Sequence, residues 1–215
     1  MGSQLGEVGP LLLIFGAIIV GAISPGPSLV YVSRIAMARS RRQGVAAAFG
    51  MGVGGVTFAI LALAGLGAVL HYAEWAYLGL KIVGGAYLVY LGIRMWLHAG
   101  RASHAPEGVA GGYSARTLGA AALAQLSNPK AIVVYGSVFA ALLPAQPPFW
   151  MYLAVPPGIF AIETGWYLFV AWAFSTSRPR AVYARFSAWI DRIAGTVLGG
   201  LGALFAFDGI RAAVR

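Results

Sequence analysis

The chain has 215 residues, of which 60% are hydrophobic and only 10% are charged. In a soluble domain roughly a quarter of the residues are charged, so this composition excludes an ordinary soluble fold. The net charge of +9 does not indicate a nucleic-acid partner, because the 15 Lys and Arg residues lie in short clusters between long apolar runs. Such clusters are typical of proteins that sit in a lipid bilayer.

Apolar stretches long enough to cross a hydrocarbon core about 30 Å thick recur along the whole chain. In chain order, we expect transmembrane helices over Leu11 to Val32, Val45 to Leu70, Trp75 to Leu97, Leu118 to Leu143, Phe149 to Phe174 and Trp189 to Ile210. The first stretch has no basic residue before it and no small-residue cleavage pattern after a short core, so we interpret it as a retained helix. The sequence predicts an all-α, polytopic membrane protein with six transmembrane helices.

Basic residues gather in the connections after the first, third and fifth predicted helices. These residues are Arg34, Arg39, Arg41 and Arg42, then Arg94, Arg101 and Arg116, and then Arg178, Arg180, Arg185 and Arg192. The opposite connections hold Glu74 and the uncharged turn from Pro144 to Pro148. Because Lys and Arg are enriched on the cytoplasmic side, we expect a protein of the bacterial inner (plasma) membrane with both termini in the periplasm.

The polar segment from Arg101 to Arg116 divides the chain into two halves. We expect residues 1–100 to form a first three-helix repeat, residues 101–116 a cytoplasmic linker, and residues 117–215 a second repeat. An odd number of helices in each half inverts the second repeat relative to the first. Both halves also open with a helix that proline interrupts. The interruptions are Ser24, Pro25, Gly26 and Pro27 in the first span and Asn128, Pro129 and Lys130 in the fourth.

Both interruptions are expected near the middle of the bilayer. At about 1.5 Å per helical residue, Ser24 lies roughly 20 Å from the periplasmic start of its helix and Asn128 roughly 15 Å from the cytoplasmic start of its own. Irregular backbone at that depth must face protein or a water-filled cavity, and transporters bind their cargo at such breaks. The alternative is that each proline only kinks its helix. Two breaks at matching depth in opposed halves favour a transporter.

Four segments of the sequence resemble the lysine exporter and homoserine/threonine resistance exporter family. They are the Ser24 to Pro27 run, the basic turn Arg39 to Gly44, the segment Leu80 to Gly92, and Gln125 through Lys130. In order and spacing the resemblance covers nearly the whole chain. It implies a six-helix, inverted-repeat exporter of amino acids that is often a homodimer and is driven by the proton gradient.

One position departs from the pattern that the resemblance implies. Members often carry an aspartate in the second span, where this chain has Gly55, whereas the acid of the fifth span is retained as Glu163. The missing carboxylate argues against a dibasic substrate, because the second ammonium of such a substrate would lack a partner. A neutral amino acid is therefore the expected substrate.

An amino acid presents a carboxylate and an ammonium, so its site needs a positive and a negative end at one depth. Helices that resume after Pro27 and Pro129 expose unpaired N–H groups and a positive dipole end, which suit the carboxylate. The expected substrate-binding residues are Ser24, Pro25, Gly26, Pro27, Ser28, Asn128, Pro129, Lys130 and Trp166. Trp166 shares a helix face with Glu163 and offers a cation–π surface, although packing alone is the alternative.

Glu163 is the acid that lies deepest in a predicted span. An ionised carboxylate there is costly unless it is paired, hydrated or protonated, so Glu163 is the expected proton-coupling residue. The alternative is a fixed ion pair with Lys130. Lys130 itself has two interpretations. In the first it has a direct role, in which it neutralises the substrate or pairs with Glu163; in the second its long side chain extends to the membrane interface.

Two GxxxG spacings, Gly50 to Gly54 and Gly195 to Gly199, predict close packing of membrane helices. The first run also satisfies a dinucleotide-binding fingerprint through Gly50, Gly52 and Gly55. That fingerprint needs a strand before it and a helix after it, whereas this one lies inside a predicted membrane helix. A dinucleotide site is therefore rejected.

No catalytic constellation is apparent in the predicted spans. The chain has no cysteine, and its three histidines have no carboxylate at a metal-ligand spacing on a shared helix. We therefore expect no enzyme activity, no cofactor and no metal. The sequence predicts a secondary transporter that exports amino acids in exchange for protons. A passive channel stays open as an alternative, because broken helices also build selectivity filters, and so does an exporter of another small metabolite or ion.

Overall fold

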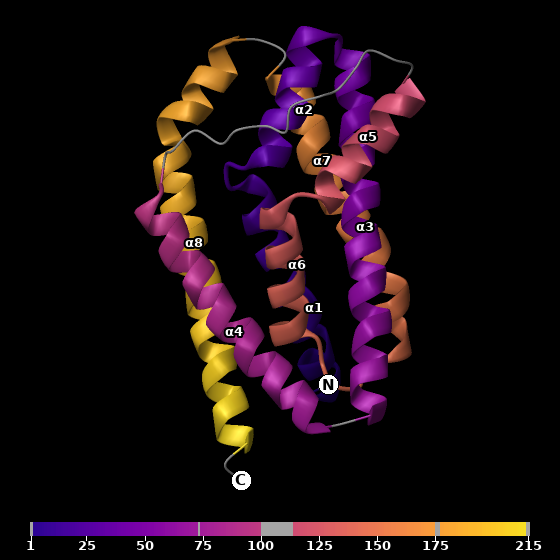
Figure 1. Cartoon of the computed structure of the whole chain (residues 1–215), viewed down its shortest axis with the longest axis vertical. Helices are drawn as coiled ribbons and strands as arrows, with labels where there is room; N and C mark the ends of the chain where they lie inside the picture. Colours follow the sequence, from indigo (N-terminus) through magenta and orange to yellow (C-terminus); the bar gives the residue numbers. More distant parts are fainter. Residues whose placement is uncertain (1, 73, 100–113, 175–176, 214–215) are drawn as a thin grey trace.

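The computed structural model describes residues 2–72, 74–99, 114–174 and 177–213. Within these ranges the chain forms eight helices and no strand, so the predicted all-α fold is confirmed (Figure 1). The helices are α1 (Gly2–Ile23), α2 (Pro27–Ala38), α3 (Arg41–Tyr72), α4 (Glu74–Leu97), α5 (Ser114–Leu126), α6 (Pro129–Leu142), α7 (Phe149–Ala173) and α8 (Ser177–Ala213).

The helices follow the predicted spans in order. Four predicted spans correspond to single helices, which are α3, α4, α7 and α8, whereas the first span is divided into α1 and α2 and the fourth into α5 and α6. α8 begins at Ser177, well before the predicted Trp189, and Pro179 lies in its first turn, where proline is tolerated. α5 begins at Ser114, within the last three residues of the predicted linker, and residues 101–113 of that linker lie outside the described residues.

Three helical segments in the described residues are long and apolar enough to cross a membrane. They are Arg41–Gly65, Phe149–Ala173 and Arg185–Ala213. A fourth span results if Val8–Ile23 and Pro27–Met37, which are bent by 55° at their break, count as one broken helix. The apolar helix Pro129–Leu142 is too short to cross by itself. The structure thus describes three to four candidate spans.

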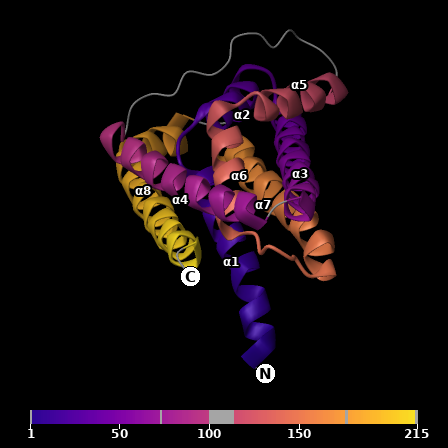
Figure 2. The ribbon, with the colours of Figure 1, turned by 60° about the horizontal axis from the view of Figure 1, so that its bottom comes forward.

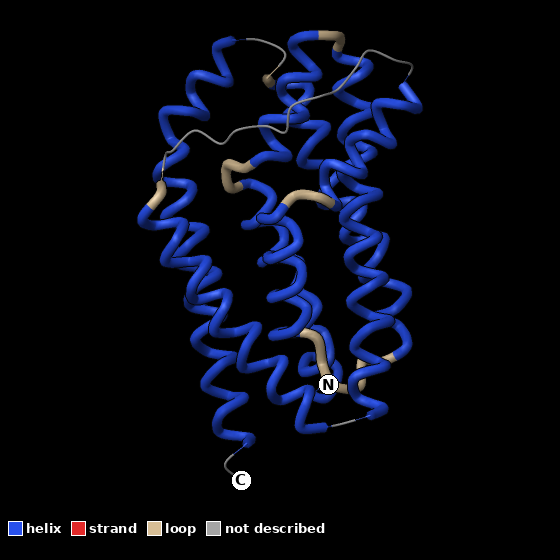
Figure 3. Tube along the Cα trace, viewed as in Figure 1, coloured by secondary structure: helices blue, strands red, loops and turns tan. Residues whose placement is uncertain are grey.

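Proline starts both helices that follow the breaks. Pro27 and Pro129 occupy the first turn of α2 and of α6, where the missing N–H is not needed. Gly26 precedes α2 in an extended conformation, and Asn128 caps α6 by accepting a hydrogen bond from the backbone N–H of Lys130. The chain therefore ends one helix and begins another at both predicted interruptions, and the two short loops lie near each other in the bundle (Figure 3).

Helices from the two halves of the chain pack against each other. α4 lies along α8, α3 packs against α7 and α5, and α6 packs against α4 and α1 (Figures 1 and 2). One buried apolar cluster includes Ile14, Leu88 and Val155 and joins α1, α4 and α7. A second cluster includes Val32 and Val170 and joins α2 to α7. These contacts hold the broken helices between the long ones.

Glycines permit the closest helix contacts. A Cβ atom on Gly54 would lie 2.7 Å from Cβ of Gln125 on α5, and one on Gly195 would lie 2.7 Å from the carbonyl oxygen of Gly92 on α4. Real Cβ atoms essentially never come so close to other heavy atoms. The close packing predicted from the two GxxxG spacings is therefore confirmed.

The most basic connections lie at one end of the bundle. The turn between α2 and α3, the start of α5 and the start of α8 are at the top of Figure 1. The connection between α6 and α7, the start of α1 and the end of α8 are at the bottom. Arg39, Arg41 and Arg42 therefore lie at the same end of the bundle as the starts of α5 and α8.

Candidate functional site

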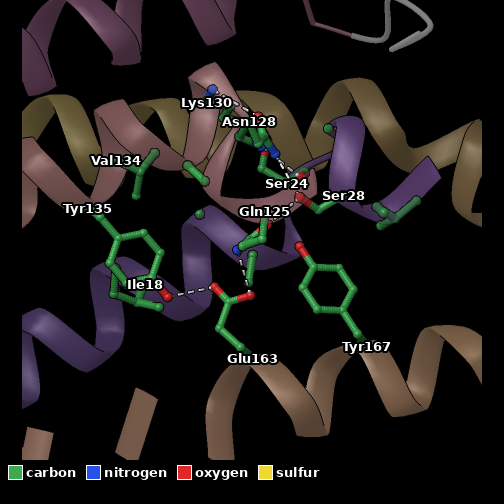
Figure 4. Close-up of a pocket in the computed structure, with 15 residues that line it drawn as sticks. Ile18, Ser24, Ser28, Gln125, Asn128, Lys130, Val134, Tyr135, Glu163 and Tyr167 are labelled. Atoms are coloured by element: carbon green, nitrogen blue, oxygen red, sulfur yellow. Dashed lines mark hydrogen bonds between the residues drawn. The ribbon is translucent and has the colours of Figure 1, made fainter. Parts of the chain in front are cut away.

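The two helix breaks meet inside the bundle. Asn128 Nδ2 donates a hydrogen bond to Ser28 Oγ at 2.7 Å, and Lys130 Nζ donates one to the carbonyl oxygen of Ser24 at 2.8 Å. Each bond joins the first half of the chain to the second. Both breaks, together with α7, line one cavity (Figure 4).

This central cavity has a polar and an apolar part. Its polar lining residues are Ser24, Ser28, Gln125, Asn128, Lys130, Tyr135, Glu163 and Tyr167. Ile18, Leu29 and Val134 supply apolar walls. Small-molecule sites generally combine apolar walls with a few convergent polar groups. The lining of the central cavity therefore has the chemistry of a site for a small polar molecule.

A chain of hydrogen bonds runs from the second break to the fifth predicted span. Asn128 donates to Ser28, Ser28 Oγ donates to Gln125 Oε1 at 2.5 Å, and Gln125 Nε2 donates to Glu163 Oε2 at 3.2 Å. All four residues are buried. These hydrogen bonds connect the Glu163 carboxylate to both helix breaks.

Glu163 accepts a hydrogen bond at each carboxylate oxygen. Tyr135 Oη donates to Oε1 at 2.9 Å, and Gln125 Nε2 donates to Oε2 (Figure 4). The residue is only 3% exposed and lies on α7 in the wall of the central cavity. A buried carboxylate surrounded by neutral donors can be held either with or without its proton, provided that a cation can approach when it is charged.

Lys130 binds backbone rather than a carboxylate. Its Nζ donates to the carbonyl oxygens of Ser24 at 2.8 Å and Pro25 at 3.2 Å. The break leaves these groups at the C-terminal end of α1 without helical partners, and a cation is favourable there. The ammonium also interacts electrostatically with the carboxylates of Asp191 and Glu163. The Lys130 ammonium is therefore held inside the protein by hydrogen bonds to the first break, and it does not extend to the membrane interface.

Gly55 faces the same acid. A Cβ atom on Gly55 would lie 2.7 Å from Tyr135 Oη and 3.0 Å from Glu163 Cγ. Any side chain at this position would therefore enter the space between α3 and the Glu163 carboxylate. The glycine leaves room for the Tyr135 hydroxyl to reach the Glu163 carboxylate. The resemblance leads us to expect an aspartate at this position.

Asp191 is a second buried acid, which hydropathy reasoning overlooked. Glu163 was the only acid expected deep in a span, because the sixth span was expected to start at Trp189. α8 instead begins at Ser177, and Asp191 is 8% exposed and accepts a hydrogen bond from Ser24 Oγ at 2.8 Å. The signal in the sequence was an acid just inside a predicted apolar span.

Three further lining residues were not predicted. Gln125 and Tyr135 hold Glu163, and Tyr167 also lines the cavity. Gln125 and Tyr135 flank the second break along the chain, and Tyr167 follows Glu163 by one helical turn. Polar residues at these spacings are common on helices, so only the structure distinguishes those that face a cavity.

The predicted binding residues divide among several places. Ser24, Gly26, Ser28, Asn128, Lys130 and Glu163 line the central cavity. Pro25 and Pro129 line a second hollow, and Pro27 begins α2. Trp166 does not line the central cavity: it lies in a separate apolar groove between α1 and α7, beside Ile19 and Phe169.

The second hollow lies between the breaks and the α4 and α8 pair. It has an empty volume of about 1020 Å³ that includes open solvent space, and Ser24 and Lys130 line both it and the central cavity. Its other lining residues include Tyr87, Tyr90, Arg94, His98 and Asp191. We call it the vestibule. Ser24 and Lys130 therefore form the boundary between the vestibule and the central cavity.

Comparison with known proteins matches nearly the whole chain to one family. A family model described as "LysE type translocator" matches residues 19–209. The threonine efflux protein of Salmonella typhi is 33% identical over 192 residues, which are 86% of this chain and 91% of that protein.

Two further relatives carry related descriptions. The threonine efflux protein of Escherichia coli K12 is 33% identical over the same proportions of both chains. The leucine efflux protein of Enterobacter sp. 638 is 31% identical over 133 residues, which are 60% of this chain and 63% of that protein. No solved structure matches the chain.

Proposed function

The chain belongs to the LysE type translocator family, and we propose that it exports neutral amino acids from the bacterial cytoplasm. As a member of a translocator family it is a multi-pass membrane protein and not an enzyme. The amino-acid substrate is proposed from the similarity to threonine and leucine efflux proteins. The observation that carries the proposal is the central cavity, because a polar site between two broken helices suits a small zwitterion.

The cavity offers groups for each part of an amino acid. The starts of α2 and α6 present N–H groups and a positive dipole end to a carboxylate, and Ser28 and Asn128 lie at these starts. Ile18 and Val134 form a wall without charge that suits a neutral side chain. Gly55 adds no second carboxylate beside Glu163, which supports a neutral rather than a dibasic substrate.

We propose six transmembrane spans in two inverted repeats, with the α1–α2 and α5–α6 pairs as the broken opening span of each repeat. The packing supports it, since the corresponding helices α3 and α7 and the corresponding helices α4 and α8 contact each other, and the two broken spans contact each other through α1 with α6 and α2 with α5. The basic connections at one end support a cytoplasmic location for that end and periplasmic termini. The location in the bacterial inner membrane and the assembly into a homodimer stay predictions.

We propose that efflux is coupled to proton influx through Glu163. The carboxylate is buried, faces the cavity and has no charged hydrogen-bond donor among the partners described above. A proton neutralises it when no cation is near, whereas a cation stabilises its charged form. When Glu163 alternates between these two states, it releases its proton as a cation enters the cavity and takes up a proton as the cation leaves.

The test is transport by purified protein in liposomes. Vesicles preloaded with radiolabelled threonine, leucine, serine or lysine are given an acidic or a matched outer pH, and efflux is followed with and without an uncoupler. We expect uphill movement of at least one neutral amino acid that requires the pH gradient. Movement that only runs downhill and ignores the uncoupler would instead show a passive channel, and no movement of any amino acid would refute the proposal.

A further inference from the structure

The Lys130 side chain crosses the boundary between the central cavity and the vestibule. It starts at the first turn of α6 and reaches the end of α1, where its Nζ binds the carbonyl oxygens of Ser24 and Pro25. It passes directly over Gly26: a Cβ atom there would lie 3.0 Å from Lys130 Cδ and 3.3 Å from Nζ. The glycine therefore leaves the space that the lysine occupies.

The groups around this ammonium form a receptor for a cation. Two carbonyl oxygens accept its hydrogen bonds, and they lie at the negative end of the α1 dipole. Asp191 is buried beside them, because it accepts a hydrogen bond from the hydroxyl of Ser24 and interacts electrostatically with Lys130. A primary ammonium with three N–H donors matches two carbonyls and a carboxylate.

An α-amino acid carries the same group. We propose that the end of α1, with Asp191, is the ammonium subsite of the transported amino acid, and that Lys130 occupies this subsite as a tethered stand-in when no substrate is bound. This inference rests on the proposed function. It assigns to Lys130 the role of a competitor for the substrate ammonium, not that of a partner for the substrate carboxylate.

The neighbouring groups complete the site. Ser28 and Asn128 lie at the starts of the resumed helices, where a carboxylate is favourable, and both line the same cavity as Ser24. When the substrate ammonium takes the subsite, Lys130 moves toward Glu163, the other carboxylate with which it interacts. No buried carboxylate then has to remain charged without a cation or a proton nearby.

Substrate binding to Lys130→Met separates the two roles of the lysine. Methionine keeps much of the length of the side chain but removes its charge, so a competitor is lost and the dissociation constant of threonine or leucine should fall. The fall is about tenfold if the lysine-bound form makes up about nine tenths of the empty protein. Weaker binding overturns the inference, because it would show that Lys130 is a partner of the substrate carboxylate, and unchanged binding overturns it, because it would show that Lys130 does not compete with the substrate.

Lys81→Met is the matched control. Lys81 is also a lysine of a membrane helix, but its ammonium lies 5.5 Å from the ring centroid of Phe205 and it lines neither the central cavity nor the vestibule. Its removal should leave the dissociation constant unchanged. Equal tightening in both variants would assign the effect to overall charge and would overturn the inference.

A soluble amine tests the subsite without any amino acid. Lys130→Ala empties the receptor, so a given concentration of propylammonium should raise the melting temperature of this variant by more than that of the unaltered protein. Adding Asp191→Asn should abolish the stabilisation. If propylammonium does not stabilise Lys130→Ala, or stabilises the double variant equally, the subsite is absent.

The outcomes distinguish the inference from the proposed function. If the unaltered protein binds and exports amino acids but Lys130→Met does not bind them more tightly, only the role of Lys130 is wrong. If no amino acid is bound or exported, the proposed function is wrong, and the propylammonium measurement alone decides whether the ammonium receptor exists.

Discussion

Glu163 and Lys130 approach the central cavity from opposite sides, from α7 and from the start of α6 (Figure 4). Neither forms a hydrogen bond to the other among those described, because Glu163 is held by Tyr135 and Gln125 and Lys130 by the end of α1. The fixed ion pair that the sequence left open is therefore replaced by two separate sets of partners. Such an arrangement leaves both groups able to change partner during a transport cycle.

The first prediction concerns the ionisation of Glu163. Glu163→Gln keeps the shape and the acceptor oxygen but cannot release a proton, so uphill, gradient-driven efflux should be abolished while exchange of substrate across the membrane persists. Glu163→Asp retains ionisation on a shorter side chain and should keep partial activity. Both are measured in liposomes under an imposed pH gradient. Normal pumping by Glu163→Gln would assign Glu163 a structural role.

The second prediction concerns the contact between Tyr135 and Glu163. A hydrogen bond to a charged group contributes about 1.5–3 kcal/mol, so Tyr135→Phe should slow gradient-driven efflux by about tenfold or more. Gly55→Ala should act in the same direction, because its Cβ would lie 2.7 Å from Tyr135 Oη.

Gly65→Ala is the control for that prediction. It places a methyl group on the same helix, α3, where a Cβ atom has nothing within 4 Å. Efflux by this variant should equal that of the unaltered protein. A loss as large as that of Gly55→Ala would show that alanine in α3, not contact with Tyr135, causes the defect.

At the scale of the elements, each break is a helix end and a helix start rather than a bend in one helix. Asn128 joins the second break to the first, since its Oδ1 caps α6 and its Nδ2 donates a hydrogen bond to Ser28 on α2. A simple proline kink, which is the alternative given in the sequence analysis, would have needed neither the cap on α6 nor the hydrogen bond to Ser28. Proline at the first helical position and a cap before it make the new start stable.

The third prediction separates these two contacts of Asn128. Asn128→Asp keeps an acceptor for the cap but loses the donor to Ser28, whereas Asn128→Ala loses both. Loss of a cap costs about 0.5–2 kcal/mol, so Asn128→Ala should have the lower melting temperature in detergent, while both variants should bind substrate more weakly. Equal melting temperatures would show that the cap does not stabilise α6.

The fourth prediction concerns the contact of α4 with α8. Gly195→Ala would place a Cβ atom 2.7 Å from the carbonyl oxygen of Gly92 and 3.0 Å from the Trp96 ring, so it should lower the melting temperature. Gly200→Ala is the control on the same helix, because a Cβ atom there has nothing within 4 Å. Alanine at that position should be neutral or stabilising. Equal behaviour of the two variants would show that α4 and α8 do not need this close approach.

At the scale of the whole molecule, the fifth prediction is the orientation in the membrane. The chain has no cysteine, so single cysteines report position without interference. Ser40→Cys, in the basic turn between α2 and α3, should be protected from an impermeant thiol reagent outside intact cells, and Gln146→Cys, between α6 and α7, should be labelled. The opposite pattern would invert the orientation drawn from the basic connections.

Much of the fold could be predicted because lipid imposes strong constraints on a sequence. Apolar length sets the helices, proline sets their breaks, and small residues mark close packing. The boundaries were less well predicted where these constraints are weak, as at the start of α8, which lies in a basic segment before the apolar run. Of the candidate site, the sequence predicted the two helix breaks and Glu163, but not the other residues that line the cavity.

By itself, the sequence determined the class of the protein, the order of its helices and the residues at which two of them break, because these depend on local composition and backbone chemistry. Only the tertiary structure decided which side chains meet. It brought Asp191 from α8 to Ser24 and turned Lys130 toward the end of α1, and it placed Trp166 outside the central cavity. The reason is that such contacts join residues far apart in the chain, and their partners depend on helix rotation and crossing, which periodicity along one helix does not specify.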